Sequence, residues 1–288
     1  MMKTLIIGMG IGALYKKVHE QLGFHVVTVD LTKPADYRSV TDAIKVHGTF
    51  DMVHICTPNH THQKLAYELG DACKIMFVEK PGLISSTEWS KLVESFPTTR
   101  IMMVKNNMWR DNIEEMQAAY SKSSVVRAHW LNENRIPNPG SWFTNRQFSF
   151  GGVSRDLLPH LLSFVAALDP KYNSSLLLYR HAWQRWSLSD LISSDYGTVD
   201  LTGKYDVDDH TDLEFVVGGH RWYIQTSWKT NKPSDISISF DDSKFELGLC
   251  PENAYNKMIT DAISNVDNDV FWQDQYHKDL WIHNNINL

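Results

Sequence analysis

The sequence contains little cysteine and no long uninterrupted apolar segment. Only three cysteines occur in 288 residues. They are too scattered for a disulfide framework, so reduced thiols and a cytoplasmic location are expected. No apolar run reaches the roughly 20 residues that a membrane-spanning helix requires. Basic residues are not in excess either, since 28 Lys+Arg face 34 Asp+Glu. This balance argues against nucleic-acid binding, which needs a concentrated basic surface.

Signature motifs of several enzyme classes are also missing. There is no Tyr-x-x-x-Lys of short-chain dehydrogenases, no GxxxxGK[ST] phosphate loop and no GxSxG nucleophile elbow. No metal site is expected, because the spacing of Cys56, His60 and His62 does not match a zinc site. The acidic segment 206–210 lacks the glycine and the closing glutamate of a calcium loop. We interpret it as a solvated turn.

The first 106 residues alternate between short apolar runs and helical patterns. The apolar runs are continuous, which is typical of strands covered on both faces in a parallel sheet with crossover helices. Strands are predicted at 3–8, 25–30, 37–40, 51–57, 74–79 and 100–105, and helices at 12–22, 41–47, 61–70 and 86–95. His54 falls inside one of these strands and is interpreted as a satisfied core residue.

From about residue 109 onward, the apolar pattern changes to period-two alternation. Strands are predicted at 125–131, 176–181, 212–217, 221–228 and 235–240, and helices at 152–168 and 252–264. Gly218-Gly219 predicts a two-residue hairpin turn, since glycine supplies the positive φ that such turns need. An antiparallel sheet with one covered face is the simplest interpretation. A domain boundary is expected after residue 108.

A glycine-rich turn, GMGIGA at 8–13, joins the first predicted strand to the first helix. Gly8 is expected to make the tight turn, and Gly10 lets the backbone approach a pyrophosphate. The small Ala13 is expected to let the helix pack closely on the strand. The free N–H groups of the helix N-terminus would then bind the phosphates. The turn therefore predicts a dinucleotide site.

Asp30 ends the second predicted strand, about twenty residues after the glycine turn. A carboxylate there accepts hydrogen bonds from the ribose diol of NAD and repels the 2′-phosphate of NADP. NAD is therefore favoured, while the nearby Lys33 keeps NADP possible. The alternative, that Asp30 only caps the following loop, agrees less well with the strand–helix–strand context.

Three polar residues from two distant segments are candidates for catalysis. Lys80 follows the predicted strand at 74–79, and ligands of open α/β sheets bind at the carboxyl ends of the strands. Asp156 and His160 are four residues apart, a spacing that places both on one face of a helix. Pro159 removes a backbone hydrogen bond, so this helix is expected to be kinked or to begin there.

Four blocks of the sequence resemble the Gfo/Idh/MocA (glucose–fructose oxidoreductase/inositol dehydrogenase) family. They are the glycine turn, CTPNHTH at 56–62, EKP at 79–81, and 151–160 from two glycines to Asp156 and His160. The resemblance covers about residues 3–168. It implies an α/β chain with an N-terminal Rossmann dinucleotide-binding domain at 1–108. A C-terminal α+β domain with an open-faced, mainly antiparallel sheet, which binds substrate and forms oligomers, would follow at 109–288.

The resemblance also implies an activity and residue roles. The protein would be an NAD(P)-dependent oxidoreductase that moves a hydride between nicotinamide and a secondary alcohol or carbonyl of a sugar, cyclitol or nucleotide sugar. Lys80 would bind a substrate hydroxyl, His160 would be the general base, and Asp156 would orient His160 or bind substrate. Substrate contacts are also expected of Trp142. The expected cofactor-binding residues are Gly8, Gly10, Ile11, Gly12, Asp30, Thr57, Pro58, Asn59, His62, Glu79, Lys80 and Asn107.

Two other functions stay open at this point. One is a glycoside-cleaving enzyme that keeps NAD tightly bound, and the other is a non-catalytic dinucleotide sensor. The complete set of Lys80, Asp156 and His160 disfavours a sensor, which needs no proton acceptor. A small molecule is the expected partner. The open sheet face and ten tryptophans also predict a homodimer or homotetramer.

Overall fold

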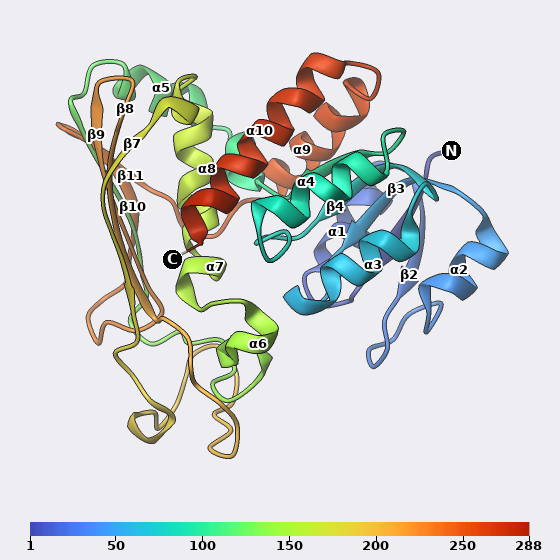
Figure 1. Ribbon diagram of the computed structural model, residues 1–288, viewed down its shortest axis with the longest axis horizontal. Coiled ribbons are helices and arrows are strands. Elements are labelled where there is room, and N and C mark those ends of the chain that lie inside the picture. Colours follow the sequence, from blue (N-terminus) through green and yellow to red (C-terminus); the bar gives the residue numbers. More distant parts are fainter. Residues whose placement is uncertain (288) are drawn as a thin grey trace. The chain divides into compact units, whose positions relative to one another are not determined.

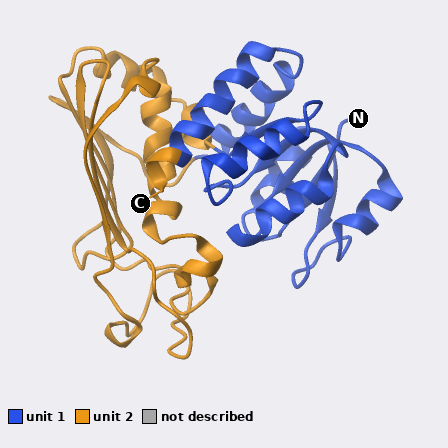
Figure 2. Cartoon of the chain, in the orientation of Figure 1, with its two compact units in different colours: residues 1–104, 251–283 blue, residues 105–250, 284–288 orange. Residues whose placement is uncertain are grey.

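The computed structural model describes residues 1–287, which group by their contacts into two compact units (Figure 2). Unit 1 comprises residues 1–104 and 251–283, and unit 2 comprises 105–250 and the residues from Asn284 onward. This grouping differs from the single boundary expected after residue 108, because 251–283 returns to unit 1. The ring of Tyr255 meets that of Tyr15 edge-on at 5.4 Å, and the backbone N–H of Met103 donates to Asp279 at 3.0 Å.

Unit 1 contains a five-stranded parallel sheet in the order β2-β1-β3-β4-β5. Its strands are β1 (Lys3–Ile7), β2 (His25–Val29), β3 (Phe50–Ile55), β4 (Cys73–Val78) and β5 (Arg100–Met103). Its helices are α1 (Gly12–Gln21), α2 (Val40–His47), α3 (His62–Leu69), α4 (Ser86–Ser95), α9 (Glu252–Ser264) and α10 (Asp269–Ile286), the last of which ends beyond the unit. This Rossmann-type arrangement confirms the predicted fold class of the N-terminal part.

Two details of unit 1 differ from the prediction. The expected strand at 37–40 is wrong, because Tyr37 forms only one isolated bridge, to Val29. The chain turns instead into α2, whose N-terminus is capped by the Ser39 hydroxyl accepting from the Asp42 N–H at 3.1 Å. Helix α10 was not predicted, because its apolar residues form no clear stripe along one face.

A pair of histidines lies in the core of unit 1. His19 and His54 are fully buried, and their Nε2 atoms are 2.8 Å apart. The ring of His54 also stacks on Phe77 at 4.6 Å, but its Nδ1 atom has no hydrogen-bond partner within residues 1–287. His54 is therefore a core residue, as predicted, but only half of its hydrogen-bonding capacity is used. Burial lowers the pKa of His19 to about 4 and that of His54 well below its usual range.

We expect this pair to make unit 1 acid-sensitive. Between its ordinary pKa of 6.5 and about 4, His19 is protonated in the unfolded chain but not in the folded one, so stability falls as the pH drops through this window. The loss from His19 approaches about 3 kcal/mol near pH 4. Urea unfolding at about pH 7 and about pH 4.5 should show a smaller acid-induced loss for His19→Leu than for the wild type. The exposed His25 provides the control, and His25→Leu should leave the loss unchanged.

Unit 2 contains a six-stranded mixed sheet in the order β11-β10-β6-β9-β8-β7. Its strands are β6 (Val125–Leu131), β7 (Leu176–Trp183), β8 (His210–Val217), β9 (His220–Ser227), β10 (Asp235–Phe240) and β11 (Ser243–Glu246). The β6–β9 pair is parallel and the other four pairs are antiparallel. The predicted Gly218-Gly219 turn joins β8 to β9 with positive φ at both glycines. The predicted mainly antiparallel sheet is confirmed.

The helices of unit 2 lie on one side of this sheet, and two of them, α7 and α8, pack directly on its strands (Figure 1). They are α5 (Ile113–Tyr120), α6 (Arg146–Ser149), α7 (Val153–Asp156) and α8 (Leu158–Leu168). The helix predicted at 152–168 is interrupted at Leu157, and α8 begins with Pro159 in its first turn. Pro159 lacks the N–H that a continuous helix would use, so the expected break is confirmed. Strand β11 and helix α5 were not predicted.

The uncovered face of the sheet carries mainly polar side chains. Arg221 pairs with Glu214, and Gln225 donates to Asp212 at 2.9 Å. The exposed apolar residues lie instead on the edge strand β7, where Leu176–Tyr179 are between 40% and 63% exposed. The homodimer or homotetramer expected from the sequence stays a prediction. No helix within residues 1–287 is long and apolar enough to cross a membrane.

The acidic segment 206–210 is buried from Val207 to His210 rather than solvated as predicted, and only Asp206 is exposed. Asp208, Asp209 and His210 are all less than 9% exposed. Both carboxylate oxygens of Asp208 accept backbone N–H bonds, from Gly152 at 2.9 Å and Ser154 at 2.8 Å. The prediction of a solvated turn was wrong because it rested on the charge of the segment alone. Carboxylates can be buried where backbone N–H groups donate hydrogen bonds to them.

Candidate functional site

The glycine turn of unit 1 has the geometry that a dinucleotide requires. Gly8 has a φ of +92°, and a Cβ there would lie 2.7 Å from the Cys56 carbonyl oxygen. A Cβ at Gly12 would lie 2.9 Å from Cγ2 of Ile6, so Gly12 lets α1 pack closely on β1. This role was predicted for Ala13, which is exposed, and that assignment is therefore wrong. The role was assigned to Ala13 from its position in the motif, because the sequence alone does not show at which residue α1 begins.

Gly10 is the open position of the turn. It is exposed, and among residues 1–287 the only atom within 4 Å of a Cβ placed there would be Nζ of Lys33, at 3.8 Å. Ile11 follows at the N-cap of α1 without a side-chain capping bond. Backbone can thus approach a ligand at Gly10, next to a helix N-terminus that favours phosphate. The turn fits the pyrophosphate of a dinucleotide.

Asp30 connects this turn to the loop after β2. Its carboxylate accepts from the N–H of Met9 at 2.7 Å, of Thr32 at 2.8 Å and of Lys33 at 2.7 Å. Partial burial alone would raise the pKa of Asp30, but these hydrogen bonds outweigh it and lower the pKa. Asp30 therefore caps the following loop and also holds the glycine turn, as an ionised acceptor. Lys33 extends back to the Met9 carbonyl oxygen at 3.3 Å.

The segment after β3 forms the next part of this edge. Thr57 and Pro58 lead into the short helix η1 (Asn59–Thr61), where the Thr61 hydroxyl donates to that of Thr57 at 2.6 Å. His62 opens α3, as predicted, but its ring is fully buried. Its two nitrogens lie 2.8 Å from the Thr57 carbonyl oxygen and 2.9 Å from that of Gly82. His62 thus links two loops, and its role beside a nicotinamide stays a prediction.

Glu79 and Lys80 follow β4 at the same carboxyl edge of the sheet. The Tyr15 hydroxyl donates to Glu79 at 2.7 Å, and the other carboxylate oxygen accepts from the Lys80 backbone N–H at 3.1 Å. Burial, and after it the charge of Glu79, raise the pKa of Tyr15 well above its usual range, so the phenol remains a donor. Tyr15 was missed from the sequence, since it shows there only as an apolar position of α1.

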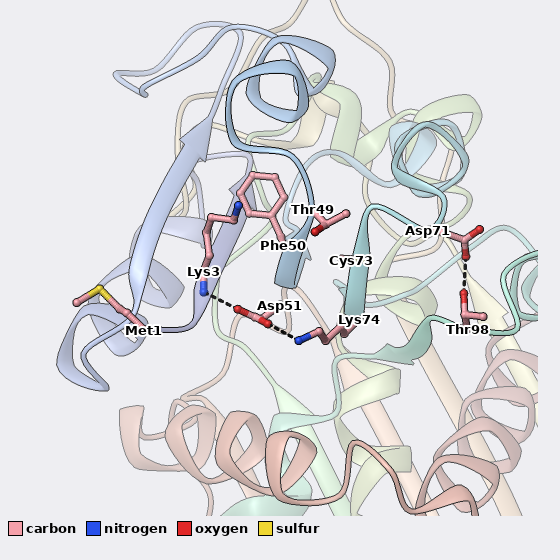
Figure 3. Close-up of a pocket in the computed structure, with 9 residues that line it drawn as sticks. All are labelled: Met1, Lys3, Thr49, Phe50, Asp51, Asp71, Cys73, Lys74 and Thr98. Atoms are coloured by element: carbon pink, nitrogen blue, oxygen red, sulfur yellow. Dashed lines mark hydrogen bonds and ion pairs between the residues drawn. The ribbon is translucent and has the colours of Figure 1, made fainter.

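A separate pocket lies at the opposite edge of this sheet, where the strands begin (Figure 3). It has a volume of about 620 Å³. Asp51 accepts there from the backbone N–H of Lys3 at 2.9 Å and from the ammonium of Lys74 at 2.8 Å. Both carboxylate oxygens thus have partners, and the pocket contains none of the predicted site residues. Ligands of parallel α/β sheets bind at the carboxyl ends of strands, so this pocket is not the candidate site.

In unit 2, the structure brings Asn107 and His160 together. Asn107 lies in η2 (Asn106–Trp109), and its Nδ2 is 3.3 Å from Nδ1 of His160. Its Oδ1 accepts from Nε of Arg110 at 2.8 Å. The ring of His160 stacks on Trp130, with centroids 5.2 Å apart. His160 is thus held from two sides, and Arg110 and Trp130 were not predicted to take part.

Asp156 is held by a second indole. Trp228, which is 1% exposed, donates from Nε1 to Oδ2 of Asp156 at 2.8 Å. The backbone N–H of Trp228 donates in turn to the carbonyl of Asp209. Helix α7, which ends at Asp156, is thus fixed both by Trp228 and by the buried segment at 208–210. Trp228 was missed because a tryptophan after a strand is typical of a core.

We expect Trp228→Phe to disturb Asp156 specifically. It removes a hydrogen bond to a carboxylate, worth about 1.5–3 kcal/mol, while keeping an aromatic ring. With a turnover assay, kcat/KM should fall by about tenfold or more. Trp222→Phe is the matched control: Trp222 is fully buried on β9 but packs on Tyr120 and Phe215. If the two variants lost equal activity at equal thermal stability, Trp228 would have no specific role.

Trp142 lies in η3 (Trp142–Thr144), partly exposed and stacked on Phe143 with centroids 3.8 Å apart. Its contact with substrate stays a prediction. Lys80 belongs to unit 1, whereas Asp156 and His160 belong to unit 2. Their joint action on one substrate also stays a prediction. No group of three or more potential metal ligands occurs among residues 1–287.

Comparison with known proteins bears on the function of this site. Residues 13–105 match the model of the Gfo/Idh/MocA family, described as an oxidoreductase family with an NAD-binding Rossmann fold. Residues 13–105 are therefore similar to the NAD-binding Rossmann domain of this oxidoreductase family. The resemblance noted in the sequence is thereby confirmed, and NAD is the cofactor of the family.

One curated relative of this chain comes from Amycolatopsis mediterranei (strain S699). It carries the provisional name UDP-kanosamine synthase oxidoreductase subunit and is 22% identical over 245 residues. The match covers 77% of the present chain but 66% of the relative, slightly less than two thirds of its length.

Two solved structures share the fold over nearly the whole chain. The WlbA (WbpB) dehydrogenase from Thermus thermophilus, in complex with NAD and UDP-GlcNAcA, superposes with a TM-score of 0.73 at 13% identity. The match covers 100% of the present chain and 94% of that structure. Levoglucosan dehydrogenase, in complex with NADH and levoglucosan, gives a TM-score of 0.70 at 15% identity, with 98% and 95% covered. At such identities these likenesses establish the fold alone.

Proposed function

We propose that this protein transfers a hydride between NAD and a secondary alcohol or carbonyl group of a sugar, cyclitol or nucleotide sugar. The observation that carries the proposal is the open Gly10 position beside the ionised, hydrogen-bonded Asp30. This pair fits the pyrophosphate and ribose of NAD, and the like charge of Asp30 disfavours the 2′-phosphate of NADP. The relatives include one named for a UDP-sugar and one crystallised with a UDP-sugar, which supports nucleotide sugars as candidates.

In this proposal the chain positions the reactants and handles one proton. Bound NAD supplies the hydride-accepting ring. Lys80, next to the Tyr15-anchored Glu79, binds the substrate oxygen, and its ammonium stabilises negative charge that develops there. Asp156 and His160, held by Trp228 and Asn107, complete the polar contacts to the substrate. Positioning of the reacting groups supplies the rest of the rate enhancement.

A thermal-shift screen followed by a turnover assay tests the proposal. NAD should raise the melting temperature more than NADP, and a ligand at about 100 times its Kd should add about 2.7 kcal/mol. Sugars, cyclitols and UDP-sugars that stabilise the NAD complex should then change the NADH absorbance. NAD that survives dialysis, with substrate cleavage but no net NADH, would instead indicate a glycoside-cleaving enzyme. Tight NADH binding without turnover on the whole panel would indicate a sensor.

A further inference from the structure

The side chain of Lys33 extends from the loop after β2 to the glycine turn. Its Nζ donates to the Met9 carbonyl oxygen at 3.3 Å and would lie 3.8 Å from a Cβ placed at Gly10. Within residues 1–287, the Met9 carbonyl is the one acceptor of this ammonium. An ammonium carries three N–H groups, so the others remain for a ligand that approaches the backbone at Gly10.

The loop after β2 holds the backbone of Lys33 on both sides. The Lys33 N–H donates to Oδ1 of Asp30 at 2.7 Å, and Arg38 donates from Nη1 to the carbonyl oxygens of Asp30 at 2.9 Å and of Lys33 at 2.6 Å. The ammonium reaches the Met9 carbonyl rather than the carboxylate of Asp30, three residues earlier. Backbone N–H groups already donate to both oxygens of that carboxylate. Lys33 thus presents its charge to the glycine turn.

The ionised Asp30 would by itself oppose an anion at this turn. Its carboxylate accepts from the N–H of Met9, the residue directly before Gly10. Like charges repel, so this carboxylate weakens the attraction that the N–H groups at the N-terminus of α1 offer to a pyrophosphate. The Lys33 ammonium lies at the carbonyl oxygen of the same residue, Met9, and carries the opposite charge. It can therefore offset the carboxylate close to the place where a pyrophosphate would bind.

We propose that the ammonium of Lys33 binds the pyrophosphate of the dinucleotide at the Gly10 position. The inference rests on the proposed function and adds a binding residue that lies outside the glycine motif. From the sequence, Lys33 was a group that keeps NADP possible. NAD and NADP contain the same pyrophosphate, so Lys33 contributes to the affinity for both and does not select between them. The preference for NAD then depends on Asp30, which faces the ribose.

Titration calorimetry with NAD, NADP and ADP-ribose tests this role. Lys33→Met removes a charge-assisted hydrogen bond and should raise the Kd of all three ligands by about tenfold. Lys33→Arg keeps the positive charge and should retain most of the affinity. The difference between Lys33→Met and the wild type should shrink at about 0.5 M salt, which screens exposed charges. Lys33 is exposed, so the melting temperature without ligand should not change.

Lys45→Met is the matched control, because it removes the same charge from unit 1. The Lys45 side chain is 71% exposed on α2, where it pairs with Asp42 at 3.7 Å, and its loss should leave the three Kd values unchanged. A loss of affinity for NADP alone would assign Lys33 to the 2′-phosphate and overturn the proposal. Equal affinities of Lys33→Met and the wild type for all three ligands would also overturn it.

The same titrations distinguish this inference from the proposed function. ADP-ribose contains the pyrophosphate but no nicotinamide, so its binding does not depend on hydride transfer. A wild type that binds none of the three ligands would refute the dinucleotide site and the Lys33 role together. A wild type that binds NAD as tightly as Lys33→Met does would refute only the Lys33 role.

Discussion

Replacement of Lys80 by methionine is expected to lower kcat by about 10²–10³-fold, because it removes a positive charge that stabilises the substrate oxygen. Methionine keeps the length of the side chain, so packing next to Pro81 should change little. Turnover is measured as NADH formation with the best substrate from the screen. Isothermal titration with NAD alone should show a much smaller change.

The strand that precedes Lys80, β4, provides the control for this variant. Lys74 lies near the start of β4, six residues before Lys80, and pairs there with Asp51 on the edge of the sheet shown in Figure 3. The Lys74 side chain is 71% exposed, so Lys74→Met should change stability by less than about 0.5 kcal/mol and leave kcat unchanged. Comparable kcat values for Lys80→Met and the wild type would remove Lys80 from the mechanism.

Gly10→Ala is expected to separate NAD binding from folding. A methyl group at Gly10 meets no atom of residues 1–287 closer than 3.8 Å, so the free energy of unfolding should change by less than about 0.5 kcal/mol. The same methyl group would occupy the space where a pyrophosphate approaches the backbone. NAD affinity should therefore fall by about tenfold or more, measured by titration calorimetry. Unchanged NAD affinity would place the dinucleotide elsewhere.

Gly8→Ala is the companion variant, in which the added methyl group clashes with the protein itself and not with the ligand. Its methyl group would lie 2.7 Å from the Cys56 carbonyl oxygen, at a φ of +92° that favours glycine. Urea unfolding should show a loss of about 2–5 kcal/mol from strain and overpacking together. NAD binding would be lost with the fold of the turn. The two variants thus distinguish a glycine needed by the ligand from a glycine needed by the chain.

The alternation of apolar runs and helical patterns predicted most of the fold. Strands β6 and β10 and helices α4 and α9 have the predicted bounds, because each combines a clear period with end signals. Helix α10 was missed because its apolar residues form no clear stripe along one face, and part of its packing is polar, such as the contact of His283 with the Leu83 N–H at 3.2 Å. Such contacts leave no periodic trace in the sequence.

The motif residues of the site could be predicted, but the residues that hold them could not. Gly8, Gly10 and Asp30 lie in a short motif whose spacing fixes their geometry. Tyr15 and Trp228 act across 64 and 72 positions, on Glu79 and on Asp156. A large aromatic residue at a buried position is common in any core, so only the coordinates reveal which atom its polar end reaches.

Because residues 251–283 belong to unit 1, this unit cannot complete its folding early during translation. The sheet of unit 1 is encoded by the first 104 residues, but Asp269 and Asp279, which bind Arg100 and the Met103 N–H, lie near the other end. During translation, the ribosome must therefore synthesise all of residues 105–250 before unit 1 receives its last two helices. Until these helices are synthesised, the part of the N-terminal sheet that they contact stays exposed. A chain truncated before residue 251 would lack this contact altogether.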